Sequence, residues 1–379
     1  MKLLRKYIDK IKPSFQEGGK YEKLQSTFEA FEAFLFVPNK TSQAGTHIHD
    51  AIDMKRTMAI VVFALLPATL FGIYNIGYQH FVSLNEIHTV DFWQIFCFGF
   101  IEFFPLVVVS YVVGLTIEFA SAQIRGHKVN EGYLVTGMLI PLIMPVDVPL
   151  WMLAVATAFA VILGKEVFGG TGMNIFNPAL VARAFIFFSY PSKMSGSSVW
   201  IADKPDAFSG ATPLSNIALG DLNIPDFHDL FFGFIPGSVG ETSTFCVLIG
   251  ALILLITGIA SFRIMFSVFL GAYLMSLVVN FTNINFYSQI PAYEQLLLGG
   301  FAFGAVFMAT DPVTASQTNT GKYIYGFFIG LLAILIRVVN PAYPEGMMFA
   351  ILIMNMFAPL IDHYVVQANI KKRLKRQIL

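Results

Sequence analysis

The chain has 379 residues, of which 56% are hydrophobic and only 13% are charged. This composition excludes an ordinary soluble globular domain, and the formal net charge of zero gives no reason to expect a nucleic-acid partner. Several apolar stretches approach the roughly 20 residues that cross a bilayer as one helix. The sequence therefore predicts an all-α polytopic membrane protein that crosses the lipid bilayer many times.

The predicted elements follow in chain order. Residues 1–56 are a lysine-rich, amphipathic N-terminal segment that we expect on the cytoplasmic membrane surface or on a partner. Residues 57–190 and 243–363 each contain five predicted transmembrane helices, which gives about ten in total. We expect Pro105 to interrupt the second helix, and the prolines between 141 and 149 to end the third. The predicted spans are 57–77, 93–119, 130–144, 150–164, 176–190, 243–260, 264–281, 295–309, 323–339 and 346–362.

Charge at the two ends predicts the orientation. The start of the chain and the tail at 364–379 are both basic, which places both termini in the cytoplasm by the positive-inside rule. With an even number of spans, the long polar loop at 191–242 then faces outward, toward the periplasm.

Two short motifs suggest an internal repeat. Asn177-Pro178-Ala179 and Asn340-Pro341-Ala342 each follow a stretch that is rich in proline or glycine. Because each half has an odd number of predicted helices, the two halves would have inverted topology, as in urea-transporter-like folds. Broken helices at matching places in inverted halves usually frame a binding site near the middle of the membrane.

Acidic residues inside predicted spans are costly and are therefore functional candidates, and three of them are Glu118, Asp311 and Asp362. Asp311 stands beside threonine hydroxyls, which suits a hard cation such as Na⁺. The alternative is that Asp311 caps a following helix that begins at Pro312. Asp362 could equally be an acid at the membrane interface. Only two cysteines occur, far apart in apolar segments, so no metal held by protein ligands is predicted.

Two polar stretches could bind a large group. Residues 165–174 form a glycine-dense turn that could be a re-entrant turn or could cradle a phosphate. In the outward loop, Thr212 follows the small residues Gly210 and Ala211, which leave its hydroxyl open to a large partner. From the residues alone, a transporter and a redox subunit both remain open.

Several longer motifs are similar to those of one membrane subunit, designated B, of the bacterial Na⁺-translocating NADH:quinone reductases. The resemblance covers nearly the whole chain and rests on residues 164–172, 177–180, 208–212, 308–316 and 337–346. It implies a sodium pump of the bacterial inner membrane, driven by redox chemistry, with five partners that are designated A, C, D, E and F. An Rnf-type ferredoxin:NAD⁺ complex and a channel or transporter without a redox cofactor are the alternatives.

The resemblance also implies cofactors and their sites. Thr212 of the Ser209-Gly210-Ala211-Thr212 motif would carry FMN through a phosphoester that a flavin transferase installs. Electrons would pass from FMN on the partner designated C to this FMN, then to non-covalent riboflavin, and then to ubiquinone or menaquinone. Glu118, Asp311 and Asp362 match acids that are linked to sodium transport in that family. Gly114 matches one of two glycines linked to quinone binding, and Leu115 replaces the second.

Overall fold

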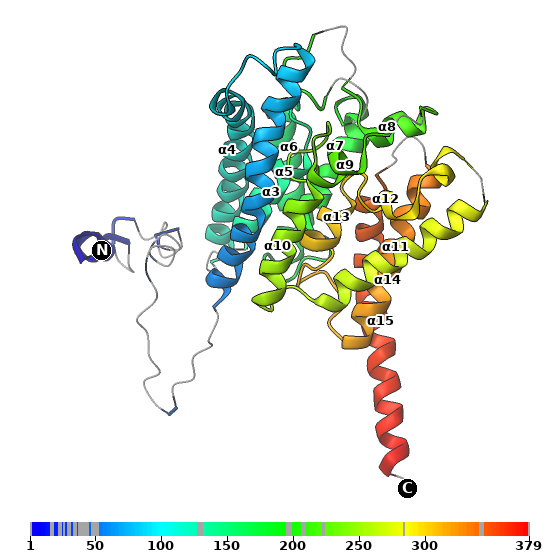
Figure 1. Cartoon of the computed structure of the whole chain (residues 1–379). Coiled ribbons are helices and arrows are strands. Elements are labelled where there is room, and N and C mark those ends of the chain that lie inside the picture. Colours follow the sequence, from blue (N-terminus) through cyan, green and yellow to red (C-terminus); the bar gives the residue numbers. More distant parts are fainter. Residues whose placement is uncertain are drawn as a thin grey trace.

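The computed structural model describes residues 53–126, 132–194, 199–205, 210–221, 224–282, 285–340 and 345–377, with short pieces of the first 52 residues. Throughout this part of the chain, helices are the only regular structure (Figure 1). The prediction of an all-α fold is confirmed. The α-helices are α1 (Lys2–Ile11), α3 (Met54–Ser83), α4 (Phe92–Arg125), α5 (Tyr133–Ile143), α6 (Leu150–Gly164), α7 (Pro178–Ser189), α8 (Pro213–Ala218), α9 (Phe227–Phe232), α10 (Thr244–Ile256), α11 (Phe262–Thr282), α12 (Ala292–Gln295), α13 (Phe301–Phe303), α14 (Asn319–Val339) and α15 (Met347–Gln377).

Six of the described helices are long and apolar enough to cross a membrane. They are α3, α4, α6 together with the 3₁₀ turn Glu166–Phe168 that follows it, α11, α14 and α15. The other four predicted spans correspond to the shorter α5, α7 and α10, and to α13 with the π-helical turn Gly304–Met308 (η6). The chain is therefore a polytopic helical protein, and the count of ten crossings stays a prediction.

Prolines lie inside three of the long helices without interrupting them, whereas the proline-rich stretch after α5 separates two helices. The expected interruption at Pro105 is wrong, because α4 runs through this residue, as α3 does through Pro67 and α15 through Pro359. Neighbouring helices and local backbone adjustment make proline tolerable within long membrane helices. The proline-rich stretch before Leu150 does end a helix as predicted, because α5 stops at Ile143 and α6 begins only at Leu150.

Small residues allow the long helices to pack closely. In the second half of the chain α11 packs on α14, and α14 packs on α15. A methyl group at Gly271 or Gly330 would collide with the backbone oxygens of Phe327 or Val268. Close approach of this kind through small residues is how helices associate in a membrane. In the first half α4 packs on α6 and α6 on α7, and α3 contacts α10 across the two halves.

The two ends of the helix bundle differ. The short helices α8 and α9 lie toward one end, and the last turns of α15 extend well beyond the bundle at the other (Figure 1). That extension carries Lys371, Lys372, Arg373, Lys375 and Arg376.

Candidate functional site

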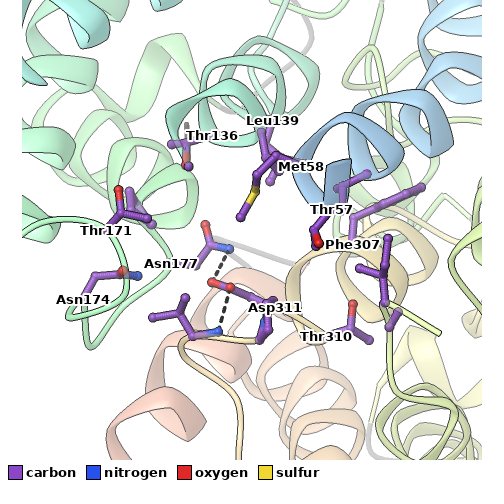
Figure 2. Close-up of a pocket in the computed structure, with 18 of the residues that line it drawn as sticks. Thr57, Met58, Thr136, Leu139, Thr171, Asn174, Asn177, Phe307, Thr310 and Asp311 are labelled. Carbon is purple, nitrogen blue, oxygen red and sulfur yellow. Dashed lines mark hydrogen bonds between the residues drawn. The ribbon is translucent and has the colours of Figure 1, made fainter. Parts of the chain in front are cut away.

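A cavity lies where the two halves of the chain meet (Figure 2). It offers about 90 Å³ to the centres of water-sized molecules. Since one water needs roughly 10–15 Å³ on this measure, there is room for several waters or a partly hydrated cation. The lining residues come from α3, α5, the end of α6, the glycine-dense turn, the start of α7, the end of α10 and the segment after η6. They include Thr57, Thr136, Lys165, Thr171, Asn174, Asn177, Thr310 and Asp311.

Asp311 is the carboxylate in this lining. Its oxygens accept hydrogen bonds from the backbone N–H of Val313 and the hydroxyl of Thr314, both at 3.1 Å. Burial raises the pKa of this carboxyl, and the two hydrogen bonds oppose that rise. The helix-capping interpretation of Asp311 is wrong, because the next described helix begins at Asn319 and is capped by Thr318. Asp311 instead closes a tight turn and lines the cavity (Figure 2).

Asn177 faces Asp311 from the first half of the chain. Its side-chain oxygen accepts the backbone N–H of Ala179 at 3.0 Å and so caps α7, where Pro178 takes the first helical position. Its side-chain nitrogen lies 3.5 Å from Asp311 Oδ2. The capping bond orients the Asn177 side chain, so that its nitrogen contacts Asp311 of the other half at the cavity wall.

Glu118 lies in α4 and is buried, but it does not line the cavity. Its carboxylate pairs with the ammonium of Lys165, and both side chains are about 95% buried. Lys165 does line the cavity and lies 5.7 Å from the centre of the Tyr133 ring. Lys165 therefore contacts the cavity directly, whereas Glu118 contacts Lys165 behind the lining.

Asp362 lies on α15 and is held by four hydrogen bonds. It accepts the hydroxyl of Ser316, the backbone N–H of Gln317, and both the backbone N–H and the hydroxyl of Thr318, at 2.6–2.9 Å. These donors follow directly after the Asp311 turn. Asp362 thus ties α15 to the segment that carries Asp311, and one structural element joins the two acids.

Gly114 has a packing explanation. The ring of Tyr133 lies against this glycine, so a Cβ atom at residue 114 would overlap with the ring. The Tyr133 hydroxyl donates to Ser110 O at 2.9 Å, which fixes the ring in place. Gly114 is needed for this contact whatever else it does.

Thr212 lies at the other end of the bundle, directly before α8. It is partly buried, and its hydroxyl lies 3.0 Å from Ser215 Oγ and accepts the Ser215 N–H at 3.3 Å. Gly210 is buried and Ala211 is partly buried, whereas Ser209 lies outside the described residues. Thr212 lines a smaller cavity whose wall includes the carboxylates of Glu241 and Glu345.

A buried arginine pairs with both of these carboxylates. Arg183 of α7 donates to Glu241 at 2.5 Å and also pairs with Glu345, which precedes α15. The guanidinium is 3% exposed, so it joins three distant segments in a region with little water. This cluster fixes the segments that surround Thr212.

The sequence singled out acids and missed their cationic partners. Lys165 and Arg183 lie in or beside apolar helices, and buried cations there are as costly as buried acids. That signal was available from the sequence. The structure brings Asp311 and Asp362 together through the 311–318 segment. Glu118 is linked to the Asp311 cavity by its partner Lys165, and Thr212 lines a different cavity.

Among the described residues, no group of three or more His, Cys, Asp or Glu side chains could hold a metal ion.

Known proteins match this chain over nearly its whole length. The model of the NQR2, RnfD, RnfE family matches residues 41–371. A protein of Ectopseudomonas mendocina is 47% identical over 99% of this chain and 100% of its own length, and one of Chromohalobacter salexigens is 47% identical over 98% and 96%. A Pseudomonas aeruginosa protein is 46% identical over 98% and 99%. All three are named as the subunit designated B of the Na⁺-translocating NADH-quinone reductase, which is an enzyme. This chain belongs to the NQR2, RnfD, RnfE family.

Proposed function

We propose that this chain is the membrane subunit designated B of a Na⁺-translocating NADH:quinone reductase in a bacterial inner membrane. The observation that carries the proposal is the identity of 47% to a relative of that name over 99% of the chain. The cavity supports it, because a carboxylate, hydroxyls and amides converge there and oxygen ligands suit Na⁺. The five partners are those designated A, C, D, E and F, and both termini lie in the cytoplasm.

Thr212 is the proposed site of covalent FMN, attached through a phosphoester by a flavin transferase. Thr212 is partly exposed and follows the small residues Gly210 and Ala211, which leaves room for a bulky group to approach. The neighbouring cavity is acidic, because Glu241 and Glu345 line it, and this disfavours a phosphate inside. The flavin would supply electron transfer, and what this chain supplies is a threonine hydroxyl beside Glu241 and Glu345, which Arg183 holds in place.

The cofactor path that we propose runs from FMN on the partner designated C to FMN on Thr212, then to non-covalent riboflavin and to quinone. Gly114 is proposed near the quinone. Its contact with Tyr133 supports a role that depends on shape, because a side chain at residue 114 would displace the ring. At the next position Leu115 replaces the second glycine of the family, so a bulky side chain stands where a glycine would leave open space.

The proposed sodium path uses Asp311, Asp362 and Glu118, toward the end of the bundle from which α15 extends (Figure 1). The contact between Asp362 and the 316–318 segment, and the position of Lys165 between Glu118 and the cavity, support this grouping. We place Na⁺ entry at the cytoplasmic side and Thr212 at the periplasmic side.

We also propose that all ten predicted segments cross or enter the membrane as two inverted five-helix repeats. In each half the second predicted span packs on the fourth, and the fourth packs on the fifth: α4 on α6 and α6 on α7, then α11 on α14 and α14 on α15. This shared order of packing supports a repeat.

The test of the function is purification of the complex through a tag on this chain. We expect five further subunits, and NADH-driven reduction of quinone that rises with added Na⁺. Ferredoxin as the redox partner would shift the assignment to an Rnf-type complex. A colourless protein that moves a solute in liposomes would contradict the redox function altogether.

A further inference from the structure

Lys165 is held at the wall of the Asp311 cavity. It follows the last residue of α6, and its backbone N–H still bonds to Val161 O of that helix. The side chain is 4% exposed, its ammonium is paired with Glu118, and it lies 5.7 Å from the centre of the Tyr133 ring. A buried ammonium is stable only where a carboxylate or an aromatic ring replaces its water, and Lys165 has both.

The same ammonium acts on both acids. It neutralises Glu118 directly, and it lines the cavity in which Asp311 stands. Its positive charge also lowers the pKa of Asp311, against the raising effect of burial. Lys165 therefore pairs with one carboxylate and shares a cavity with the other.

Two of the carboxylates near this wall, Glu118 and Glu166, already have a cationic partner. Lys165 pairs with Glu118. Glu166 is held by Arg125 at 3.7 Å and by the hydroxyl of Ser121 at 2.5 Å. Within the described residues, Asp311 is thus the carboxylate with no cation of its own. A single monovalent cation in the cavity would give Asp311 a counter-ion.

We propose that Lys165 is an internal counter-ion which Na⁺ displaces from Glu118 as the ion passes through the cavity. The inference rests on the proposed sodium transport and adds a residue to it. As Na⁺ leaves Asp311 for Glu118, the flexible four-carbon stem of Lys165 lets the ammonium turn from Glu118 toward Asp311, which has just lost its cation. The ion then takes the place of the ammonium at Glu118. Throughout the exchange each carboxylate keeps one cation, which avoids the cost of an unpaired buried charge.

The first test removes the competing cation with Lys165→Met, in the complete complex. We expect the Na⁺ concentration for half-maximal quinone reduction, and for ²²Na⁺ uptake into proteoliposomes, to fall by about fivefold or more. Lys193→Met, which changes a lysine outside this cavity, is the matched control and should leave both values unchanged. An unchanged or higher half-saturation in an assembled Lys165→Met complex overturns the proposal.

The second test keeps the charge, so it is informative even where Lys165→Met fails to assemble. In Lys165→Arg, the planar guanidinium can hold Glu118 through two parallel hydrogen bonds and should be harder to displace. We expect half-saturation to rise by about fivefold or more. A purely structural partner would tolerate arginine with wild-type Na⁺ dependence, and that result overturns the proposal. Failure of the proposed function is distinct, because the wild-type complex would then show no Na⁺ dependence.

Discussion

Asn177 and Asp311 are 134 residues apart in the sequence, yet the side-chain amide of Asn177 lies 3.5 Å from the carboxylate of Asp311. The first residue caps α7, and the second closes a turn after η6. The contact therefore joins the two halves of the chain at a cavity that has room for water or a cation (Figure 2). This junction is where we expect Na⁺ to meet the protein.

Asp311→Asn should weaken Na⁺ binding and leave the turn in place. An asparagine oxygen can still accept the Val313 N–H, so the loss is mainly that of charge. Loss of one charged ligand costs about 1.5–3 kcal/mol, or about ten- to 100-fold in half-saturation. A Na⁺ titration of quinone reduction measures it. A half-saturation equal to that of the wild type would show that Asp311 only shapes the turn.

Protons should compete with Na⁺ at the same carboxylate. Because burial raises the pKa of Asp311, this group takes up a proton at higher pH than an exposed aspartate does. Acidification therefore reduces its ionised fraction earlier than that of an exposed aspartate, so half-saturation by Na⁺ should rise as the pH falls. Glu118 and Lys165 face the same region and remain in Asp311→Asn, which is the control. If that variant keeps the full pH effect, the competing proton binds elsewhere.

The acid on α15 should act on Na⁺ through the neighbouring turn. Asp362→Ala leaves the donors of residues 316–318 without their acceptor, which costs about 1–3 kcal/mol and loosens the segment after Asp311. We expect a higher Na⁺ concentration for half-maximal quinone reduction and a lower melting temperature. Asp362→Asn, which retains one acceptor oxygen, should lie between the variant and the wild type. Unchanged sodium dependence in Asp362→Ala would leave this residue as an interfacial acid.

Gly114→Ala should disturb the Lys165 site at a distance. The new methyl group displaces the Tyr133 ring, and the ring lies beside the ammonium of Lys165. Overpacking of this kind costs about 1–3 kcal/mol, so thermal melting of the complex should occur at lower temperature. Gly164→Ala is the matched control, because its methyl group would only touch Val181 at 3.5 Å. Equal melting temperatures for the two variants would contradict the packing explanation.

The sequence was sufficient to predict the long helices. Runs of apolar residues predicted α3, α4, α11, α14 and α15, because a membrane helix needs length and apolar character and little else. The acids stood out for the same reason, since Asp311 and Asp362 interrupt apolar surroundings. Their arrangement could not be predicted, because it depends on which helices pack together.

Two residue pairs show this limit. Lys165 and Glu118 are 47 residues apart, and they meet only because α6 packs on α4. Arg183 reaches Glu345 across 162 residues, and nothing near either residue in the sequence identifies its partner. The role of Asp311 was open for another reason. An aspartate before proline can cap a helix or close a turn, and only the start of α14 at Asn319 decides between them.

The central claim is that Thr212 carries the flavin, and one measurement tests it directly. The complex is expressed with a flavin transferase, denatured fully, and its bands are examined for flavin fluorescence in a gel. The account predicts a fluorescent band for this chain in the wild type and in Ser215→Ala, which removes the neighbouring hydroxyl 3.0 Å away. It predicts a dark band in Thr212→Ala. A fluorescent Thr212→Ala band, or a dark wild-type band while the transferase modifies another substrate, would contradict it.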